Sequence, residues 1–274
     1  MPLPNLAGQV ALITGASQGI GRGIALALAD AAATIYITGR NRPALERVAA
    51  EVRERGGSPE AVVCDHADDA QVDALFERIR DEQSQFDLLV NNVWGGYEAH
   101  PEGMRPKPFW EAGLEDWDAM FVHGLRPHFV ASRLAAPLMV ARKRGLIVNT
   151  IAWAQGKYLL QLYYDVAKHA AARMAYGMSL ELTPLGVTAI AVSPGFARTE
   201  RVMAAHKAHP FDLSWTESPE YVGRGIAHLL ADPALMTRTG QVFTAGQLAR
   251  EYGFSDIDGR QPEPFAMPAS IAMD

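Results

Sequence analysis

Residues 10–29 read VALITGASQGIGRGIALALA: a short apolar run, a turn with three glycines and a second apolar segment. This order predicts a buried strand over residues 10–13, a tight turn over 14–21 and a helix over 24–29. Glycines let the backbone approach a pyrophosphate with no Cβ in the way, and the start of a helix offers unpaired N–H groups and partial positive charge. The stretch therefore predicts a dinucleotide-binding turn, with an ordinary Gly-rich loop as the alternative.

Length and composition limit what the chain can be. Its 274 residues, 49% of them hydrophobic, can bury one substantial core, so we expect a single domain over residues 1–274. A net charge of -6 without a basic stripe argues against a nucleic-acid partner. The one cysteine, Cys64, excludes an intrachain disulfide, and the sequence supports neither a signal peptide nor a membrane span. We expect a cytoplasmic protein that binds no metal.

The end of the second β-rich run bears on the cofactor. Residues 34–38 favour a strand, and Gly39 and Arg40 follow it. An NAD site usually places an acid about 20 residues beyond the glycines, whereas an NADP site replaces that acid and sets an arginine near the 2′-phosphate. The sequence therefore predicts NADP(H) as the cofactor with Arg40 at its 2′-phosphate. The alternative is a surface arginine that opens the next helix, over residues 43–55.

Further strands and helices alternate along the chain, which is typical of a doubly wound, largely parallel α/β sheet with helices on both faces. We expect strands over residues 61–64, 86–90, 145–151, 188–192 and 240–245. Helices are expected over residues 70–83, 117–142 and 217–230 as well.

One tyrosine and one lysine suit proton transfer. Tyr164 and Lys168 are four residues apart in an apolar-periodic segment, so they share one face of a helix. A phenol of pKa about 10 is a poor base at neutral pH, but a nearby ammonium stabilises the phenolate. The pair predicts Tyr164 as proton donor and acceptor, with Lys168 lowering its pKa. The neighbouring Tyr163 has no lysine four residues later.

The turn beginning at Thr14, the Tyr164–Lys168 pair and the Pro194-Gly195 segment resemble the short-chain dehydrogenase/reductase family over about residues 8–253. The resemblance implies a Rossmann-type α/β fold with a largely parallel seven-stranded sheet. It also implies hydride transfer between NADP(H), bound at the strand carboxyl ends, and a carbonyl or alcohol carbon of a small molecule. A lid over residues 200–216 and a C-terminal tail over 254–274 complete the expected organisation.

The same resemblance assigns the cofactor contacts. It implies that Asp65 and the backbone of His66 hold the adenine, that Asn92 and Lys168 hold ribose, and that Tyr164 lies beside the nicotinamide. As alternatives, Asp65 begins a turn and His66 is a loop residue. Further contacts are expected from the turn and from the segment after the sixth strand: Gly15, Ser17, Gln18, Gly19, Ile20, Gly21, Pro194, Gly195, Ala197 and Thr199.

A narrower resemblance concerns the dehydrogenase/reductase member 1 group of this family. It is carried by Gly124-Leu125-Arg126, by a long Pro-rich insert over residues 96–113 and by the tail over residues 248–260. The group implies NADPH-dependent reduction of steroid-like and xenobiotic carbonyls. Family members form dimers or tetramers through the helices that here carry Trp117 and Tyr164, so a homo-oligomer is expected.

Two family positions are replaced. The catalytic serine should lie twelve or thirteen residues before Tyr164, where the chain has Ala152 and Ile151. Thr150 is one strand residue away, so its side chain should face the opposite side of the sheet. The family's active-site asparagine aligns with Gly124, and His123 beside it points roughly 100° away on a helix. We expect His123 at the helix surface or at an interface.

These replacements leave three functions open: a carbonyl reductase that uses Tyr164 alone, a reductase of a C=N bond, or an NADP-binding sensor without turnover. Residues 96–113, which follow the fourth strand, predict one wall of a substrate pocket, with a subunit contact as the alternative. Aromatic side chains favour an apolar, cyclic substrate, although half of them fit core or interface positions equally well. The predicted pocket residues are Trp94, Trp153 and Tyr158, supported by Tyr97 and Trp110.

Overall fold

A parallel sheet of seven strands organises the computed structural model, which describes residues 2–97, 107–153 and 157–266. All neighbouring strands pair in parallel, in the order β3-β2-β1-β4-β5-β6-β7. The predicted doubly wound, Rossmann-type sheet is confirmed. The strands are β1 Val10–Ile13, β2 Thr34–Gly39, β3 Ser58–Val63, β4 Leu88–Asn91, β5 Leu146–Thr150, β6 Thr188–Ser193 and β7 Val242–Thr244.

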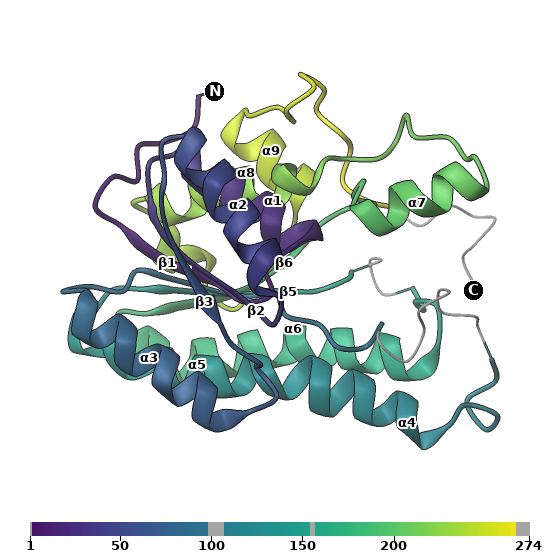
Figure 1. The fold of residues 1–274 in the computed structure, drawn as a ribbon, viewed down its shortest axis with the longest axis horizontal. Helices are drawn as coiled ribbons and strands as arrows, with labels where there is room; N and C mark the ends of the chain where they lie inside the picture. Colours follow the sequence, from purple (N-terminus) through teal and green to yellow (C-terminus); the bar gives the residue numbers. More distant parts are fainter. Residues whose placement is uncertain (1, 98–106, 154–156, 267–274) are drawn as a thin grey trace.

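Helices cover both faces of this sheet (Figure 1). On one face lie α1 Gly19–Ala29, α2 Arg42–Glu54, α8 Pro219–Ala231 and α9 Ala245–Tyr252. On the other lie α3 Asp69–Glu82, α4 Leu114–Trp117, α5 Arg126–Ala141 and α6 Leu162–Leu182. Helix α7, Glu200–Ala208, follows β6, and short 3-10 turns occupy Thr183–Leu185 and Leu235–Arg238.

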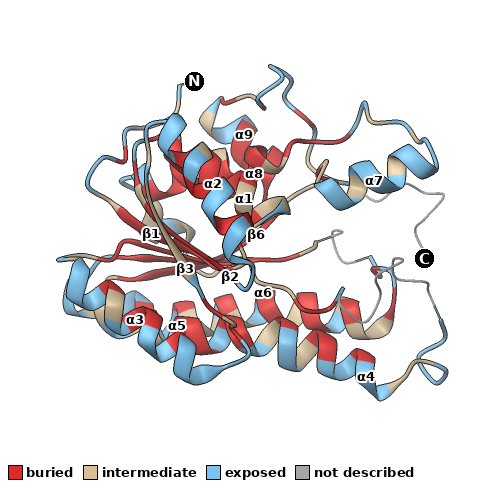
Figure 2. Cartoon of the chain, in the orientation of Figure 1, coloured by how far each residue is buried: buried red, intermediate tan, exposed pale blue. Residues whose placement is uncertain are grey.

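Each face of the sheet has its own hydrophobic core. In β1, Ala11 and Ile13 pack into the cluster under α1 and α8, whereas Val10 and Leu12 pack into the cluster against α3 and α5. This alternation follows from the two-residue period of a strand. Figure 2 shows buried central strands with the edge strand β3 only partly buried, and α2, α3 and α5 exposed on the faces turned away from the sheet. The sheet is therefore rigid beneath the loops at its carboxyl edge.

The helix expected over residues 117–142 is interrupted. A π-helical turn, Asp118–Leu125, separates α4 from α5, and the N–H of Arg126 bonds to Phe121 O, five residues back. Pro127 follows at once and has no N–H to donate, so one bond of a regular α-helical ladder is missing at this point. Such wide turns occur often at functional sites. No helix among the described residues combines the length and apolarity needed to cross a membrane.

Candidate active site and cofactor-binding cleft

The Gly-rich turn after β1 has no room for side chains. Gly15 and Gly19 adopt φ of +67° and +59°, in the left-handed region that favours glycine. A Cβ on Gly15 would lie 2.8 Å from Val93 Cα. The Asn92 amide donates to Thr14 O and to Gly15 O, both at 3.0 Å. Asn92 directly follows β4, the neighbour of β1 in the sheet, so it holds the turn from that side. This is the close-fitting backbone cradle that a pyrophosphate requires.

The start of α1 already holds an anion. The N–H of Gly19 donates to Glu200 Oε2 at 2.9 Å, and the other oxygen of this carboxylate lies 3.9 Å from the Arg22 guanidinium. Glu200 is the first residue of α7. The carboxylate therefore stands in for the anionic group that this helix start attracts, and the residues present fit a dinucleotide pyrophosphate.

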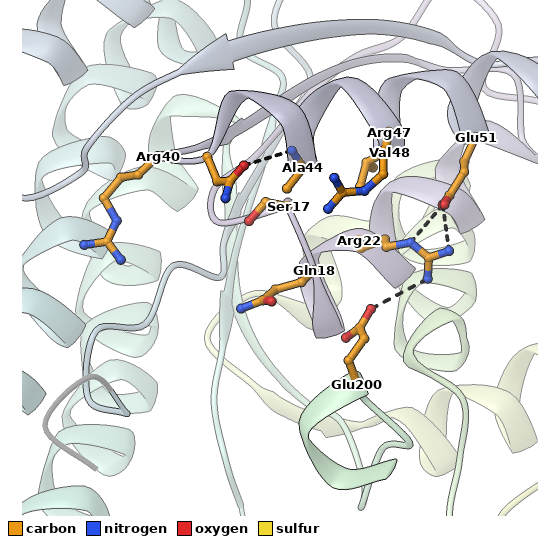
Figure 3. A pocket seen from close by; sticks show the side chains of 10 residues that line it. Ser17, Gln18, Arg22, Arg40, Ala44, Arg47, Val48, Glu51 and Glu200 are labelled. Atoms are coloured by element: carbon orange, nitrogen blue, oxygen red, sulfur yellow. Dashed lines mark hydrogen bonds and ion pairs between the residues drawn. The ribbon is translucent and has the colours of Figure 1, made fainter. Parts of the chain in front are cut away.

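A cavity of about 660 Å³ extends from this turn to the start of α2 (Figure 3). Asn41 caps α2, with its side-chain oxygen accepting from Ala44 N at 3.0 Å. The volume lies in the range of small-molecule sites, about 300–1,000 Å³. Its lining includes the predicted Arg40 and two further arginines, Arg22 and Arg47, that the sequence did not single out. The full lining is Ser17, Gln18, Arg22, Arg40, Asn41, Ala44, Arg47, Val48, Glu51 and Glu200.

Asp65 and His66 lie after β3 and differ in role from each other. Asp65 makes a turn, because its carboxylate accepts from Ala67 N at 3.0 Å. His66 lies in the turn between β3 and α3, as the loop alternative had it, but its side chain is buried, with Nε2 2.8 Å from Thr38 Oγ1, and burial lowers its pKa to about 4. The neutral His66 ring therefore packs beneath the sheet edge.

Tyr164 lies on α6 in an aromatic cluster. Its ring meets Trp94 edge-on with centroids 5.7 Å apart and stacks on Tyr97 at 6.4 Å. Burial, and then the Tyr97 side chain to which it hydrogen-bonds, raise the pKa of Tyr164 well above its ordinary value. The expected lowering of this pKa by Lys168 is therefore wrong: the pKa of Tyr164 is raised, and burial is the first cause.

Lys168 points at the same cluster. Its Nζ lies 3.4 Å from the centroid of a Trp94 ring and 5.8 Å from the centroid of Tyr164. Burial lowers the pKa of Lys168 to about 7. A cation held on an indole face is stabilised by the ring quadrupole but is not neutralised. The structure therefore brings the predicted pair together, with the ammonium on Trp94.

Trp94 also explains the glycine at the family's asparagine position. A Cβ on Gly124 would lie 2.8 Å from Trp94 Cζ3, so the indole takes the space of a side chain at position 124. The N–H of Gly95 donates to His123 O at 3.1 Å and ties this loop to the π-helical turn. The His123 side chain is exposed, as expected. The indole and Gly124 are thus a matched pair.

His128 is a residue that the sequence analysis missed. It lies one helical turn after Gly124 and is buried, with Nε2 2.9 Å from Val93 O. Burial, and then the charge of Lys168, lower its pKa to about 3. The neutral ring must donate from Nε2, which leaves Nδ1 as a buried acceptor without a partner among the described residues. Its spacing of four from Gly124 was the available signal.

The replaced serine positions carry no hydroxyl toward Tyr164. Ile151 is buried in a cluster with Ala171 and Ala191, and Ala152 packs against the cluster that contains Tyr164. Thr150 Oγ1 donates to Asn91 O at 3.1 Å inside the sheet. Thr150 therefore does not replace the serine, as its position on the strand predicted.

The predicted aromatic wall forms only in part. Trp94 and Tyr97 contact Tyr164, whereas Trp153 packs on His169 at 5.1 Å. Tyr158 lies near Asp165, which together with burial raises the pKa of Tyr158. Trp110 is 72% exposed and pairs with Phe109, and residues 98–106 of the predicted loop lie outside the described residues. The predicted roles of Trp153, Tyr158 and Trp110 in a substrate pocket therefore stay predictions.

The segment after β6 is anchored by a buried acid. Gly195 N donates to Glu217 Oε1 at 2.8 Å, and Ala197 forms a β-bridge with Glu217. Burial raises the pKa of Glu217 to about 8. Thr199 caps α7 by accepting from Val202 N at 3.3 Å. The predicted residues Pro194 to Thr199 thus lie in one fixed backbone segment that leads into α7.

Helix α7 reaches over the aromatic cluster. The guanidinium of Arg201 lies 4.5 Å from the centroid of the Tyr97 ring, and Tyr97 stacks on Tyr164. Through Glu200 the same helix contacts the Gly-rich turn. The segment over residues 200–216, which was expected to be a lid, thus begins with a helix that contacts both the Gly-rich turn and the aromatic cluster.

Comparison with known proteins agrees with this geometry. The family model for short chain dehydrogenase matches residues 9–210. Dehydrogenase/reductase SDR family member 1 of Mus musculus is 40% identical over 266 residues, covering 92% of this chain and 84% of that protein. The Homo sapiens protein of the same name is 37% identical over 277 residues, covering 96% and 88%.

A solved structure adds the fold. The hydroxysteroid dehydrogenase from Escherichia coli superposes with a TM-score of 0.74 at 25% identity, covering 88% of this chain and 96% of that one. The predicted resemblance, including the narrower one to the member 1 group, is confirmed. The family uses a nicotinamide cofactor.

Proposed function

We propose that the chain, which belongs to the short-chain dehydrogenase/reductase family, is an NADP(H)-dependent oxidoreductase that acts on a carbonyl or alcohol of an apolar or cyclic substrate. One observation carries the proposal. Tyr164 and Lys168 meet in an apolar cluster on the sheet edge that also holds the glycine cradle. A phenol and an ammonium in a dry site beside a dinucleotide cradle suit proton-coupled hydride transfer.

The chain's own residues would hold the cofactor. The turn residues Gly15 to Gly21 fit the pyrophosphate, and Glu200 must leave Gly19 N when a nucleotide binds, since two anions cannot share one N–H. The bound nicotinamide would supply or accept the hydride. The remaining contacts are proposed from Arg40, Asp65, His66, Asn92, Lys168, Pro194, Gly195, Ala197 and Thr199.

Tyr164 would move the proton. Because burial raises its pKa, Tyr164 is a neutral phenol at physiological pH and can donate its proton to a substrate oxygen as hydride reaches the carbon. Lys168, whose Nζ lies 5.8 Å from the centroid of the Tyr164 ring, would bond the nicotinamide ribose and so place the cofactor beside Tyr164. The arrangement in the structure therefore favours reduction.

The missing serine favours a second candidate. Ala152 packs against the Tyr164 cluster and offers no hydrogen bond to a carbonyl oxygen. The nitrogen of a C=N bond needs one proton and no separate oxyanion donor, so an imine substrate would suffer less from this loss. A third possibility, a sensor that binds NADP(H) without turnover, is decided by the same experiment.

The test compares neighbouring tyrosines. NADPH oxidation is followed with a panel of ketones, diketones and cyclic imines, using wild type, Tyr164→Phe and Tyr163→Phe. Tyr163 lies on the same turn of α6 and contacts Trp117, so its variant controls for a lost phenol elsewhere. We expect Tyr164→Phe to lose at least about 100-fold in turnover, the lower end of the general acid range, while NADPH binding and the Tyr163→Phe rate persist.

Two results would contradict the proposal. Full activity in Tyr164→Phe would remove Tyr164 as proton donor. Tight NADPH binding by wild type with no oxidation on any panel member would instead support the sensor. Turnover of cyclic imines alone would select the second candidate.

We also propose a homo-dimer or homo-tetramer that works in the reducing cytosol. Outward-facing apolar side chains on α5 and α6 are exposed, with Phe129 at 55%, Val166 at 42% and Leu180 at 62%. Exposed apolar side chains on these two helices fit a subunit contact. Light scattering of the purified chain tests this: a monomer at micromolar concentration would exclude such a dimer or tetramer under those conditions.

A further inference from the structure

We propose that Arg47, on the second turn of α2, binds the 2′-phosphate of NADP(H) and makes the chain prefer it over NAD(H). This inference rests on the proposed function and goes further, since Arg40 was the residue expected for that role. Arg47 is an exposed side chain that lines the cavity beside the Gly-rich turn. The three arginines of this cavity differ in their contacts and directions.

Arg22 is already neutralised. Its Nη2 lies 2.7 Å from Glu51 Oε2, and its Nε donates to the same oxygen at 2.8 Å. Glu200 adds a longer contact at 3.9 Å. If a nucleotide displaces Glu200, Glu51 still pairs with Arg22, so this arginine has little charge to offer a second anion.

Arg47 is placed differently. It lies one turn before Glu51 on α2, yet the Glu51 carboxylate is taken by Arg22, and no ion pair joins Arg47 to any other residue in the described ranges. Figure 3 shows its guanidinium extending over the cavity between Ser17 and Arg22. A guanidinium in this position can bind a phosphate with two parallel hydrogen bonds.

Arg40 lines the same cavity from the loop after β2, but its side chain extends away from Ser17 (Figure 3). The ribose position is marked by Gly39, which stands where an NAD site has its acid. A Cβ on Gly39 would lie 3.3 Å from Ser17 Oγ, so Gly39 and Ser17 are neighbours. A phosphate beside Ser17 therefore meets Arg47 on the side where Arg40 is turned away.

Binding, and not turnover, tests this assignment. Dissociation constants for NADPH and NADH are measured by nicotinamide fluorescence at fixed ionic strength, and competition by 2′-AMP and 5′-AMP isolates the phosphate. The variants are Arg47→Ala, Arg47→Lys and Arg40→Ala. The matched control is Arg53→Ala, an exposed arginine of the same helix that is not part of the cavity lining.

We expect Arg47→Ala to weaken NADPH and 2′-AMP binding about 10- to 100-fold, the range for a lost charge-assisted hydrogen bond, and to change NADH binding less than about twofold. Retained NADH binding also shows that the variant is folded. Arg47→Lys should fall between, because an ammonium cannot bind bidentately. Arg53→Ala should match wild type.

The inference is overturned if wild type prefers NADPH and Arg47→Ala keeps that preference, or loses NADPH and NADH binding equally; the proposed function then stands with Arg40 as the remaining candidate. Wild type that prefers NADH, or binds neither nucleotide, overturns the proposed cofactor and this inference together. The two failures are thus distinguishable in one set of titrations.

Discussion

The ammonium of Lys168 lies 3.4 Å from the centroid of a Trp94 ring, on the face of the indole. A side chain that the family uses beside its catalytic tyrosine is here held by an aromatic ring and kept out of water. Its pKa is lowered to about 7, so near neutral pH both the charged and neutral amine are populated. The charge of Lys168 therefore depends on the burial to which Trp94 contributes.

Replacing Trp94 with leucine should raise the pKa of Lys168. Two effects compete: losing the cation–π contact costs the ammonium about 1–2 kcal/mol, whereas water admitted to the site relieves the burial that lowers the pKa. A burial effect of several pKa units is the larger. We expect the pKa to move up by about one unit or more, measured by NMR of ¹³C-labelled lysine with Lys168→Met for assignment. An unchanged or lower pKa of Lys168 would show that the cation–π contact with the indole has more effect on this pKa than the exclusion of water.

Adding a methyl group at Gly124 should destabilise the protein by about 1–3 kcal/mol, as overpacking of a filled site does. The new Cβ would lie 2.8 Å from Trp94 Cζ3. Gly177→Ala is the control, because a Cβ at this helical position meets nothing within 4 Å. It should stabilise slightly, by about 0.5–1 kcal/mol. Urea unfolding measures both.

The clash at Gly124 should disappear in the double variant. Removing the indole with Trp94→Leu gives the new Cβ room, so the cost of Gly124→Ala should fall toward zero in that background. Equal costs with and without Trp94 would show that the two positions do not interact.

His128 should make the fold sensitive to mild acid. Its pKa is lowered from 6.5 to about 3, so below pH 6.5 the unfolded chain binds a proton that the folded chain does not. Stability therefore falls as the pH drops from about 6.5. His128→Gln should reduce the slope of unfolding free energy against pH by up to about 1.4 kcal/mol per unit. The exposed His123→Gln is the control; equal slopes in both variants would contradict the assignment.

Restoring a serine at Ala152 should separate the candidate substrates. For a ketone, a hydroxyl beside Tyr164 adds an oxyanion donor, worth about 100-fold in turnover. Cyclic imines should gain little. Ala152→Val, which adds volume without a donor, is the control. If Ala152→Ser raises ketone turnover no more than Ala152→Val does, position 152 is not where the missing donor belongs.

Much of this structure followed from local pattern. Strand, Gly-rich turn and helix over residues 10–29 predicted β1 and α1, and the alternation of elements predicted the parallel sheet, because a parallel strand order needs helical crossovers. The spacing of Tyr164 and Lys168 predicted their convergence on one face of α6. Short periodic signals of this kind are contained in neighbouring residues, so no knowledge of distant contacts is needed to read them.

The rest depended on contacts between distant residues. The pKa of Tyr164 is raised because Trp94 and Tyr97 exclude water, and neither residue is near it in sequence. The burial of His128 could not be predicted from its neighbours in sequence, because it depends on the packing of α5 against Val93. The break in the long helix could have been predicted, since Pro127 removes a donor at that place.

The arginines show the same limit. Arg40 could be predicted because it directly follows a strand. Arg47 lines the cavity only because of the face of α2 that is turned toward α1. The same orientation of α2 lets its Glu51 pair with Arg22 of α1. Charge pairing across two helices cannot be read from either helix alone.

The carboxylate of Glu200 on Gly19 N makes the chain its own competitor for the dinucleotide. A tethered acid acts at high effective concentration, so only the fraction of molecules with α7 released can bind, and the apparent affinity is reduced by that fraction. We expect the same acid to return to Gly19 N as spent nucleotide departs and so to promote its release. The Glu200→Gln variant should accordingly bind NADPH more tightly and release it more slowly in stopped-flow displacement. In wild type, Glu200 would thus lower the affinity for the nucleotide and speed up turnover.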